Sequence, residues 1–178
     1  EKDGIVSFPK GTKGVTAIFD FYSKAVTGAI NRSLNLNHGR KHVEKAIASI
    51  AREIEDTGRR EIPYDRAAEL VDAVRPGSGR TDDDLLFQLE HEGILARERL
   101  YAEEEDAESI RFVFERYGDH IVARSILAAV PDGHDFSRDP LPARLSNVMA
   151  DDPSFIDPGV LEAIAVQLPE RFGVELYD

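Results

Sequence analysis

The apolar side chains of residues 110–126 change their spacing midway along the segment. Ile110, Phe112 and Phe114 alternate with polar or smaller residues, which is typical of a half-buried strand. The following apolar residues recur at the spacing of one helix face, and they are Tyr117, Ile121, Val122 and Ile126. We therefore predict a strand that leads directly into a helix. Its expected core anchors are Phe112, Phe114, Tyr117 and Ile121.

Apolar residues at helical spacing predict four further helices before this strand. The four patterns lie at 15–30, 39–57, 64–75 and 81–92. Gly58 follows the second pattern and Gly93 follows the fourth, and glycine readily adopts the left-handed conformation that ends a helix. Pro76 closes the third pattern. Thr81 can accept hydrogen bonds from the first amides of the fourth helix, so we expect it to be the N-cap.

A hairpin is predicted between the fourth helix and the junction of strand and helix. Residues 94–101 and 110–114 would form its strands, and the acidic segment 102–109 its tip. Three helices followed by a two-stranded wing is the element order of a winged helix, a variant of the helix-turn-helix. A last helix is expected after Asp157, with Pro158 at its first position. The predicted fold is mainly α with a small β-hairpin.

These elements divide the chain into three parts. We expect a linker and helical lead-in at 1–38, a winged-helix domain with its following helix at 39–130, and a loop and one helix at 131–178. Because Glu1 is not preceded by a methionine or a signal peptide, we expect the chain to be a piece of a longer polypeptide. The absence of cysteine excludes disulfides and, together with the missing signal peptide, favours a cytoplasmic location. No apolar run approaches the ~18 residues that a membrane span needs.

The net charge of −12 is distributed unevenly. Residues 1–60 hold 11 Lys or Arg against 7 Asp or Glu, whereas residues 61–178 hold 11 against 27. The third helix of a winged helix commonly enters the DNA major groove, but here segment 81–92 has five acidic residues and no Lys or Arg. The wing tip, which includes Glu103 and Glu104, is also acidic. Phosphate contacts supply most of the affinity for nucleic acid, so we expect no nucleic-acid binding through this surface.

Signatures of an active site or a metal site are missing from the sequence. The segment "RPGSGR" at 75–80 lacks the Gly-Lys-Ser/Thr ending of a phosphate-binding loop. His38 and His42 are four apart, but no Glu follows in the metalloprotease pattern, so we expect surface histidines. We therefore predict no catalytic residue, no metal site and no cofactor in this chain.

Several stretches, in their order along the chain, resemble a known family. They are "FPKGTKGVTAIFDFY", "LLFQLEHEGILARER" with the acidic hairpin after it, "IRFVFERYGDHIVARSIL" and "GVLEAIAVQLPERFGVELYD". Together they resemble the segment after the ATPase core of bacterial STAND NTPases, especially the large antiviral kind. The resemblance covers most of the chain, and its most specific piece is "RFxFERxxDHxxA".

The resemblance implies a role in switching. In such ATPases the winged helix packs against bound nucleotide in the closed state and swings away on activation, when the protein oligomerises. It implies ATP or ADP with Mg in the parent, and as partners the ATPase core and a C-terminal sensor region of the same polypeptide, toward which 131–178 would lead. Related families often place a His just after the wing strand, near the phosphates. The corresponding residue here is Phe114, which departs from that pattern.

A polar stripe on the helix after the strand is the candidate coupling surface, and it consists of Arg116, Asp119, His120 and Arg124. On a helical wheel these residues lie opposite the apolar arc that must face the core. Arg116 and Asp119 are three apart and could merely pair on the surface. In the other interpretation the stripe docks on the nucleotide-binding core and helps to hold the closed state. The sequence leaves both interpretations open.

Three functions are consistent with these observations. The first is a non-catalytic regulatory part of a STAND-type signalling NTPase that couples nucleotide state and sensor to homo-oligomerisation, with antiphage defence as its setting. The second is a free-standing adaptor that binds another protein through its acidic winged helix. The third is a DNA-binding regulator whose effector domain is missing. The sequence favours the first of them, without any contact to a membrane.

Overall fold

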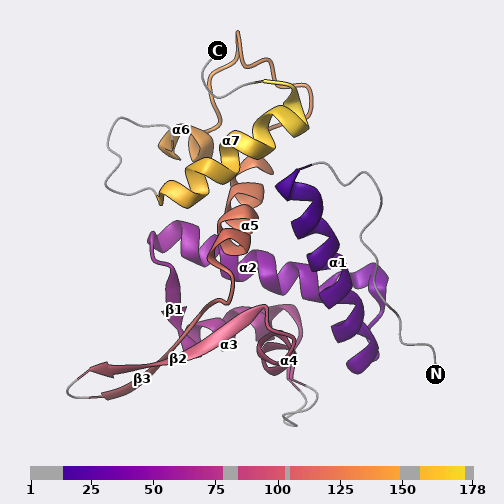
Figure 1. Ribbon diagram of the computed structural model, residues 1–178, viewed down its shortest axis with the longest axis vertical. Helices are drawn as coiled ribbons and strands as arrows, with labels where there is room; N and C mark the ends of the chain where they lie inside the picture. The colour runs from indigo at the N-terminus through magenta and orange to yellow at the C-terminus, as the bar shows by residue number, and fades with distance from the viewer. Residues whose placement is uncertain (1–13, 78–83, 103–104, 149–156, 175–178) are drawn as a thin grey trace.

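The computed structural model describes residues 14–77, 84–102, 105–148 and 157–174. The fold is mainly helical with a small three-stranded antiparallel sheet (Figure 1). The helices are α1 (Val15–Ser33), α2 (His42–Thr57), α3 (Tyr64–Val74), α4 (Leu85–His91), α5 (Glu115–Leu127), α6 (Ala143–Val148) and α7 (Pro158–Phe172), with a 3₁₀ turn at His38–Arg40. The strands are β1 (Glu61–Pro63), β2 (Leu95–Ala102) and β3 (Glu105–Phe112).

The helix ends follow the signals in the sequence. Gly58 ends α2 with a φ of 64°, and Gly93 follows α4 with a φ of 74°, so both adopt the predicted left-handed conformation. The carboxylate of Asp84 caps α4, because it accepts a hydrogen bond from the amide of Phe87 at 3.1 Å. Thr81, which was predicted as this cap, lies outside the described residues. The predicted linker at the chain start lies outside them as well.

The sheet has the order β1-β3-β2, and both pairings are antiparallel. The predicted hairpin is β2 with β3, and it extends away from the helices (Figure 1). Strand β1 was not predicted, because three residues are too few to display an alternating pattern. Its Ile62 lies opposite Ile110 of β3, and both side chains are buried. The tip residues Glu103 and Glu104 lie outside the described residues.

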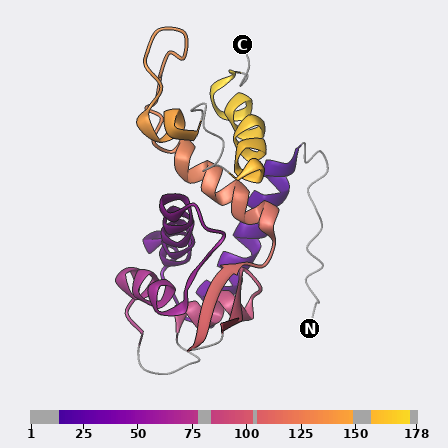
Figure 2. The same ribbon diagram turned by 90° about the vertical axis from the view of Figure 1, so that its left-hand side faces the viewer.

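Helix α5 lies at the centre of the molecule. It leaves the sheet at the end of β3 and packs against both α2 and α7, as the two views show (Figures 1 and 2). One continuous apolar core joins all three parts of the chain, and it includes Ile30, Ile50, Ile110, Ile126, Leu145 and Ile164. Among the described residues, no helix is both long enough and apolar enough to cross a bilayer.

Three of the four predicted core anchors are confirmed and one is wrong. Phe112, Tyr117 and Ile121 are buried. Phe114 is 57% exposed, because β3 ends at Phe112 and Phe114 is the residue that precedes the first turn of α5. The alternation of apolar residues therefore continues two residues beyond the strand itself. Phe114 keeps an edge contact with Tyr22 of α1, at 5.9 Å between ring centres.

The interior glycine of α5 explains how the strand and the helix pack together. A Cβ on Gly118 would lie 2.8 Å from the ring of Phe112, which is closer than side chains approach one another. Phe112 also meets Tyr117 edge to face at 5.8 Å. Because Gly118 has no side chain, the ring of Phe112 can pack directly against the backbone of α5.

The C-terminal part of the chain is partly as predicted. Helix α7 begins after Asp157, whose carboxylate accepts a hydrogen bond from the amide of Gly159 at 2.9 Å, and Pro158 occupies the first turn. Helix α6 was not predicted, since its six residues follow a segment rich in Pro, Gly and Asp. Arg144 of α6 forms an ion pair with Glu55 of α2 and donates to the carbonyl of Ser125 in α5 at 3.3 Å.

Candidate functional site

The predicted polar stripe of α5 lies where other helices of the same chain cover it. Arg124 forms an ion pair with Asp20 of α1. Arg116 lies 3.6 Å from Glu162 of α7, and both side chains are largely exposed. The stripe is therefore only partly covered, because Arg116 remains exposed to solvent while other members contact α1 and α7. We name this region the α5 junction. It comprises the stripe and the side chains around it, which are Phe19 and Asp20 of α1, Arg60 after α2, Glu115 of α5, Asp157 at the start of α7, and Glu162 and Gln167 of α7.

His120 is the most buried member of the stripe, with 3% of its surface exposed. The side-chain amide of Gln167 in α7 donates to the carbonyl of His120 at 2.9 Å. Arg124 donates to Nε2 of His120 at 2.9 Å, and the ring of Phe19 in α1 lies 5.0 Å away. The helical wheel placed His120 on the side away from the core, and this was wrong because α1 and α7 cover that side.

The surroundings of His120 keep its imidazole neutral. Burial lowers its pKa to about 4, and the nearby Arg124 guanidinium lowers the pKa in the same direction. Arg124 can only donate hydrogen bonds, so Nε2 must accept, and a protonated imidazole would direct an N–H at a cation. His120 therefore acts as a neutral hydrogen-bonding group between α5 and its neighbours.

Asp119 packs against the first turn of α7. A Cβ on Gly159 would overlap with Oδ2 of Asp119 and would lie 2.8 Å from its Cγ, so only glycine allows this approach. Arg116 and Asp119 do not pair with each other, because Arg116 is directed at Glu162. The surface pairing considered from the sequence is therefore not formed in this structure.

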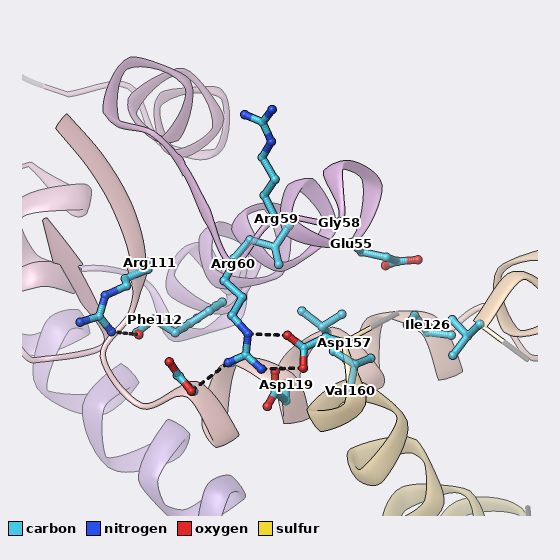
Figure 3. A pocket seen from close by; sticks show the side chains of 15 residues that line it. Glu55, Gly58, Arg59, Arg60, Arg111, Phe112, Asp119, Ile126, Asp157 and Val160 are labelled. Atoms are coloured by element: carbon cyan, nitrogen blue, oxygen red, sulfur yellow. Dashed lines mark hydrogen bonds and ion pairs between the residues drawn. The ribbon is translucent and has the colours of Figure 1, made fainter. Parts of the chain in front are cut away.

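Arg60 is the cation that faces Asp119. It follows α2 and forms an ion pair with Asp157, the cap of α7 (Figure 3). A second ion pair joins it to Glu115 of α5 at 2.9 Å. Burial raises the pKa of Asp119 to about 6, while Arg60 opposes that rise and Asp157 and Glu115 add to it. Figure 3 shows Arg60 directed toward Asp157 and Asp119, and Arg59 directed away from them.

These groups border a cavity of about 110 Å³ between the end of α2, α5 and the start of α7. Its apolar walls include Ile54, Phe112, Val122 and Val160. The sequence did not indicate Arg60 or Gln167 as part of a site, because each is a single polar residue without a motif. Asp157 was recognised only as a helix cap. Its second role, the ion pair with Arg60, depends on the tertiary fold.

The chemistry that the junction offers is electrostatic contact between helices far apart in the sequence. Guanidinium–carboxylate pairs and one neutral imidazole connect α1, α5 and α7 with the end of α2. Within the described ranges, no group of three His, Asp or Glu side chains is placed to hold a metal ion. Comparisons of the chain with protein-family models, curated proteins and solved structures found no match.

Proposed function

We propose that this chain is a non-catalytic regulatory module that acts through protein contacts. More specifically, we propose that it is the winged-helix and following segment of a STAND-type signalling NTPase, in which nucleotide state and a sensor are coupled to oligomerisation. The α5 junction is the observation that carries this proposal. There a single helix is held to α1, α7 and the Gly58–Arg60 turn by polar contacts that can be exchanged.

The order of elements supports the winged-helix part of the proposal. Helices α2, α3 and α4 are followed by the β2–β3 hairpin, as in a winged helix. Strand β1 lies between the first two of these helices in the chain and pairs with β3, which gives the wing a third strand at its base. Helix α5 begins three residues after β3 ends, at the base of the β2–β3 hairpin, which is where the helix that follows the wing is expected in this proposal.

The charges around the sheet favour a protein partner over nucleic acid. Arg97 pairs with Glu90 of α4 at 2.9 Å and with Glu108 of β3 at 3.2 Å. Arg111 donates to Glu98 at 2.7 Å. These cations are matched by carboxylates within the fold, so they do not form a basic surface for phosphates. The DNA-binding alternative is correspondingly the weakest of the three.

A switch requires two arrangements whose free energies differ by only a few kcal/mol. The ion pairs of the junction suit this requirement, because exposed pairs each contribute at most about 1 kcal/mol and new partners can replace them. The apolar side of α7 keeps the contact ordered through Val160, Ile164 and Leu168, all of which are buried. We propose that α7 shifts relative to α5 when the parent NTPase is activated.

Within this proposal, the module contacts the ATPase core and the sensor region of the same polypeptide in the cytoplasm. ATP or ADP with Mg binds elsewhere in the parent, which forms homo-oligomers on activation, and antiphage defence is the proposed setting. The free-standing adaptor is the second candidate, because it requires the same acidic, protein-binding fold.

The coding sequence next to this chain distinguishes the two candidates. A phosphate-binding loop and an acidic magnesium-binding strand encoded before Glu1 are the expected finding for the NTPase. A start codon immediately before Glu1 would contradict it and leave the adaptor.

A further inference from the structure

A second hollow lies on the other side of Asp119, in the groove between the start of α1, the start of α5 and α7. Its volume is about 230 Å³. Apolar side chains from two helices line it, and they are Val15 and Phe19 of α1 with Ala163 and Val166 of α7. Val15 is 44% exposed and Val166 is 37% exposed. Ile18, one turn after Val15, is 46% exposed, so large aliphatic side chains remain open to solvent beside this groove.

The polar side of the groove has more negative than positive charge. Arg60 alone faces three carboxylates, those of Glu115, Asp119 and Asp157, and it forms ion pairs with the first and the last. The other cation of the groove, Arg116, forms an ion pair with Glu162 at 3.6 Å. Among the described residues, none donates a hydrogen bond to Asp119. The four carboxylates therefore exceed the two guanidinium groups by two negative charges, and one of them, Asp119, is partly withdrawn from water.

We propose that this groove binds a peptide segment of a partner protein, with a lysine or arginine of the segment on Asp119 and its flanking aliphatic side chains on Val15 and Val166. Lys and Arg suit the place because their aliphatic stems lie along apolar walls while the charged end reaches a carboxylate. A metal ion fits less well, because within the described part of the chain no three acidic or His side chains are placed to hold one. The proposal concerns the surface alone, so it does not depend on the parent being an NTPase.

Selection from a display library of random short peptides tests the proposal, with the whole chain as bait. The enriched peptides should share a Lys or Arg flanked by aliphatic residues. A synthetic peptide with that consensus is then titrated into the chain, and a matched peptide with Glu in place of the basic residue is titrated beside it. The basic peptide should bind at least about tenfold more tightly than its Glu counterpart, since a charge-assisted hydrogen bond is lost in the latter.

Variants of the chain assign the binding to the groove. Asp119→Asn removes the charge and Val166→Ser removes part of the apolar wall without adding a charge, so each should weaken the basic peptide at least about tenfold. Leu141→Ser is the matched control, because Leu141 is 40% exposed and does not line the groove. It should leave the affinity unchanged. Circular dichroism of each variant establishes that it is folded.

Amide shifts in the nuclear magnetic resonance spectrum provide a second readout that needs no variant. Addition of the basic peptide should shift the amides of Phe19, Asp119 and Val166 more than those of α3. Three results would overturn the proposal: no enriched peptide, enriched peptides without a basic residue, or equal binding by Asp119→Asn. None of them bears on the coding sequence beside this chain, so the proposed function is tested separately.

Discussion

Asp119 and His120 are neighbours on α5 whose protonation affects stability in opposite directions. The pKa of Asp119 is raised to about 6, so its contribution to stability is fully present below pH 3.8 and is lost as the pH rises through 6. The pKa of His120 is lowered to about 4, so its contribution is present above pH 6.5 and is lost as the pH falls toward 4. The two windows overlap, and in the native chain the two effects partly offset each other.

The variant Asp119→Asn separates these effects. It removes the Asp119 contribution and leaves that of His120, so its free energy of unfolding should fall more steeply than that of the native chain between pH 6 and pH 4. At pH 7 the variant should be more stable by about 1 kcal/mol, a value that allows for solvent screening of this half-buried group. Urea denaturation at several pH values measures both. Parallel curves for the two proteins would contradict the assignment.

Phe112 and Phe114 provide a second comparison at the level of single residues. Phe112→Ala should lower the free energy of unfolding by about 3–5 kcal/mol, because it empties a buried site against Gly118. Phe114→Ala should cost less than about 1 kcal/mol, since the side chain is 57% exposed and contacts the ring of Tyr22 at its edge. Urea denaturation compares the two. Similar losses would place Phe114 in the core after all.

Between elements, the close approach of α7 to α5 depends on Gly159. Alanine usually favours a helix by about 1 kcal/mol relative to glycine, but here its Cβ would overlap with the Asp119 carboxylate. We expect Gly159→Ala to destabilise the chain by about 1–3 kcal/mol. Gly28→Ala in α1 is the matched control, because its nearest neighbour is the end of the Arg32 side chain at 3.4 Å, and it should be neutral or stabilising.

A double-mutant cycle identifies the cause of that loss. If the carboxylate is the obstacle, Asp119→Ala should restore most of the stability of the Gly159→Ala protein. Additive losses, measured by thermal unfolding of the four proteins, would show that the contact between α5 and α7 is not as close as described.

Elements with a long hydrophobic pattern and a recognisable end residue were predictable. Short elements, and contacts made between elements, were not. Helices α1, α2 and α7 carry many apolar residues at helical spacing, and Gly58 and Asp157 mark their ends. Strand β1 and helix α6 are too short for their period to appear. The polar stripe of α5 was found from the sequence, but its neighbours were not. A helical wheel orders residues around one helix and contains no information about the elements that cover each side.

At the scale of the whole molecule, we expect the net negative charge to disfavour nucleic acid as a partner. The net charge is −12, and arginines of the sheet such as Arg97 and Arg111 pair with carboxylates of the fold. We therefore expect no retention of a labelled DNA duplex by micromolar protein at physiological salt. A gel-shift titration at two salt concentrations measures this. Retention that weakens as salt rises would favour the DNA-binding alternative.

We propose that the α5 junction responds to nucleotide in the NTPase of which this chain is proposed to be a part. Hydrogen exchange of the intact polypeptide, followed by mass spectrometry with ADP and then with ATP and Mg, tests it most directly. With ATP we expect faster exchange in peptides that cover Val160–Leu168 of α7 and Gly118–Ile121 of α5, because the contacts of His120 with Gln167 and of Arg60 with Asp157 would open. Peptides of α2 should keep their protection. Equal protection of the junction in both nucleotide states would contradict the claim.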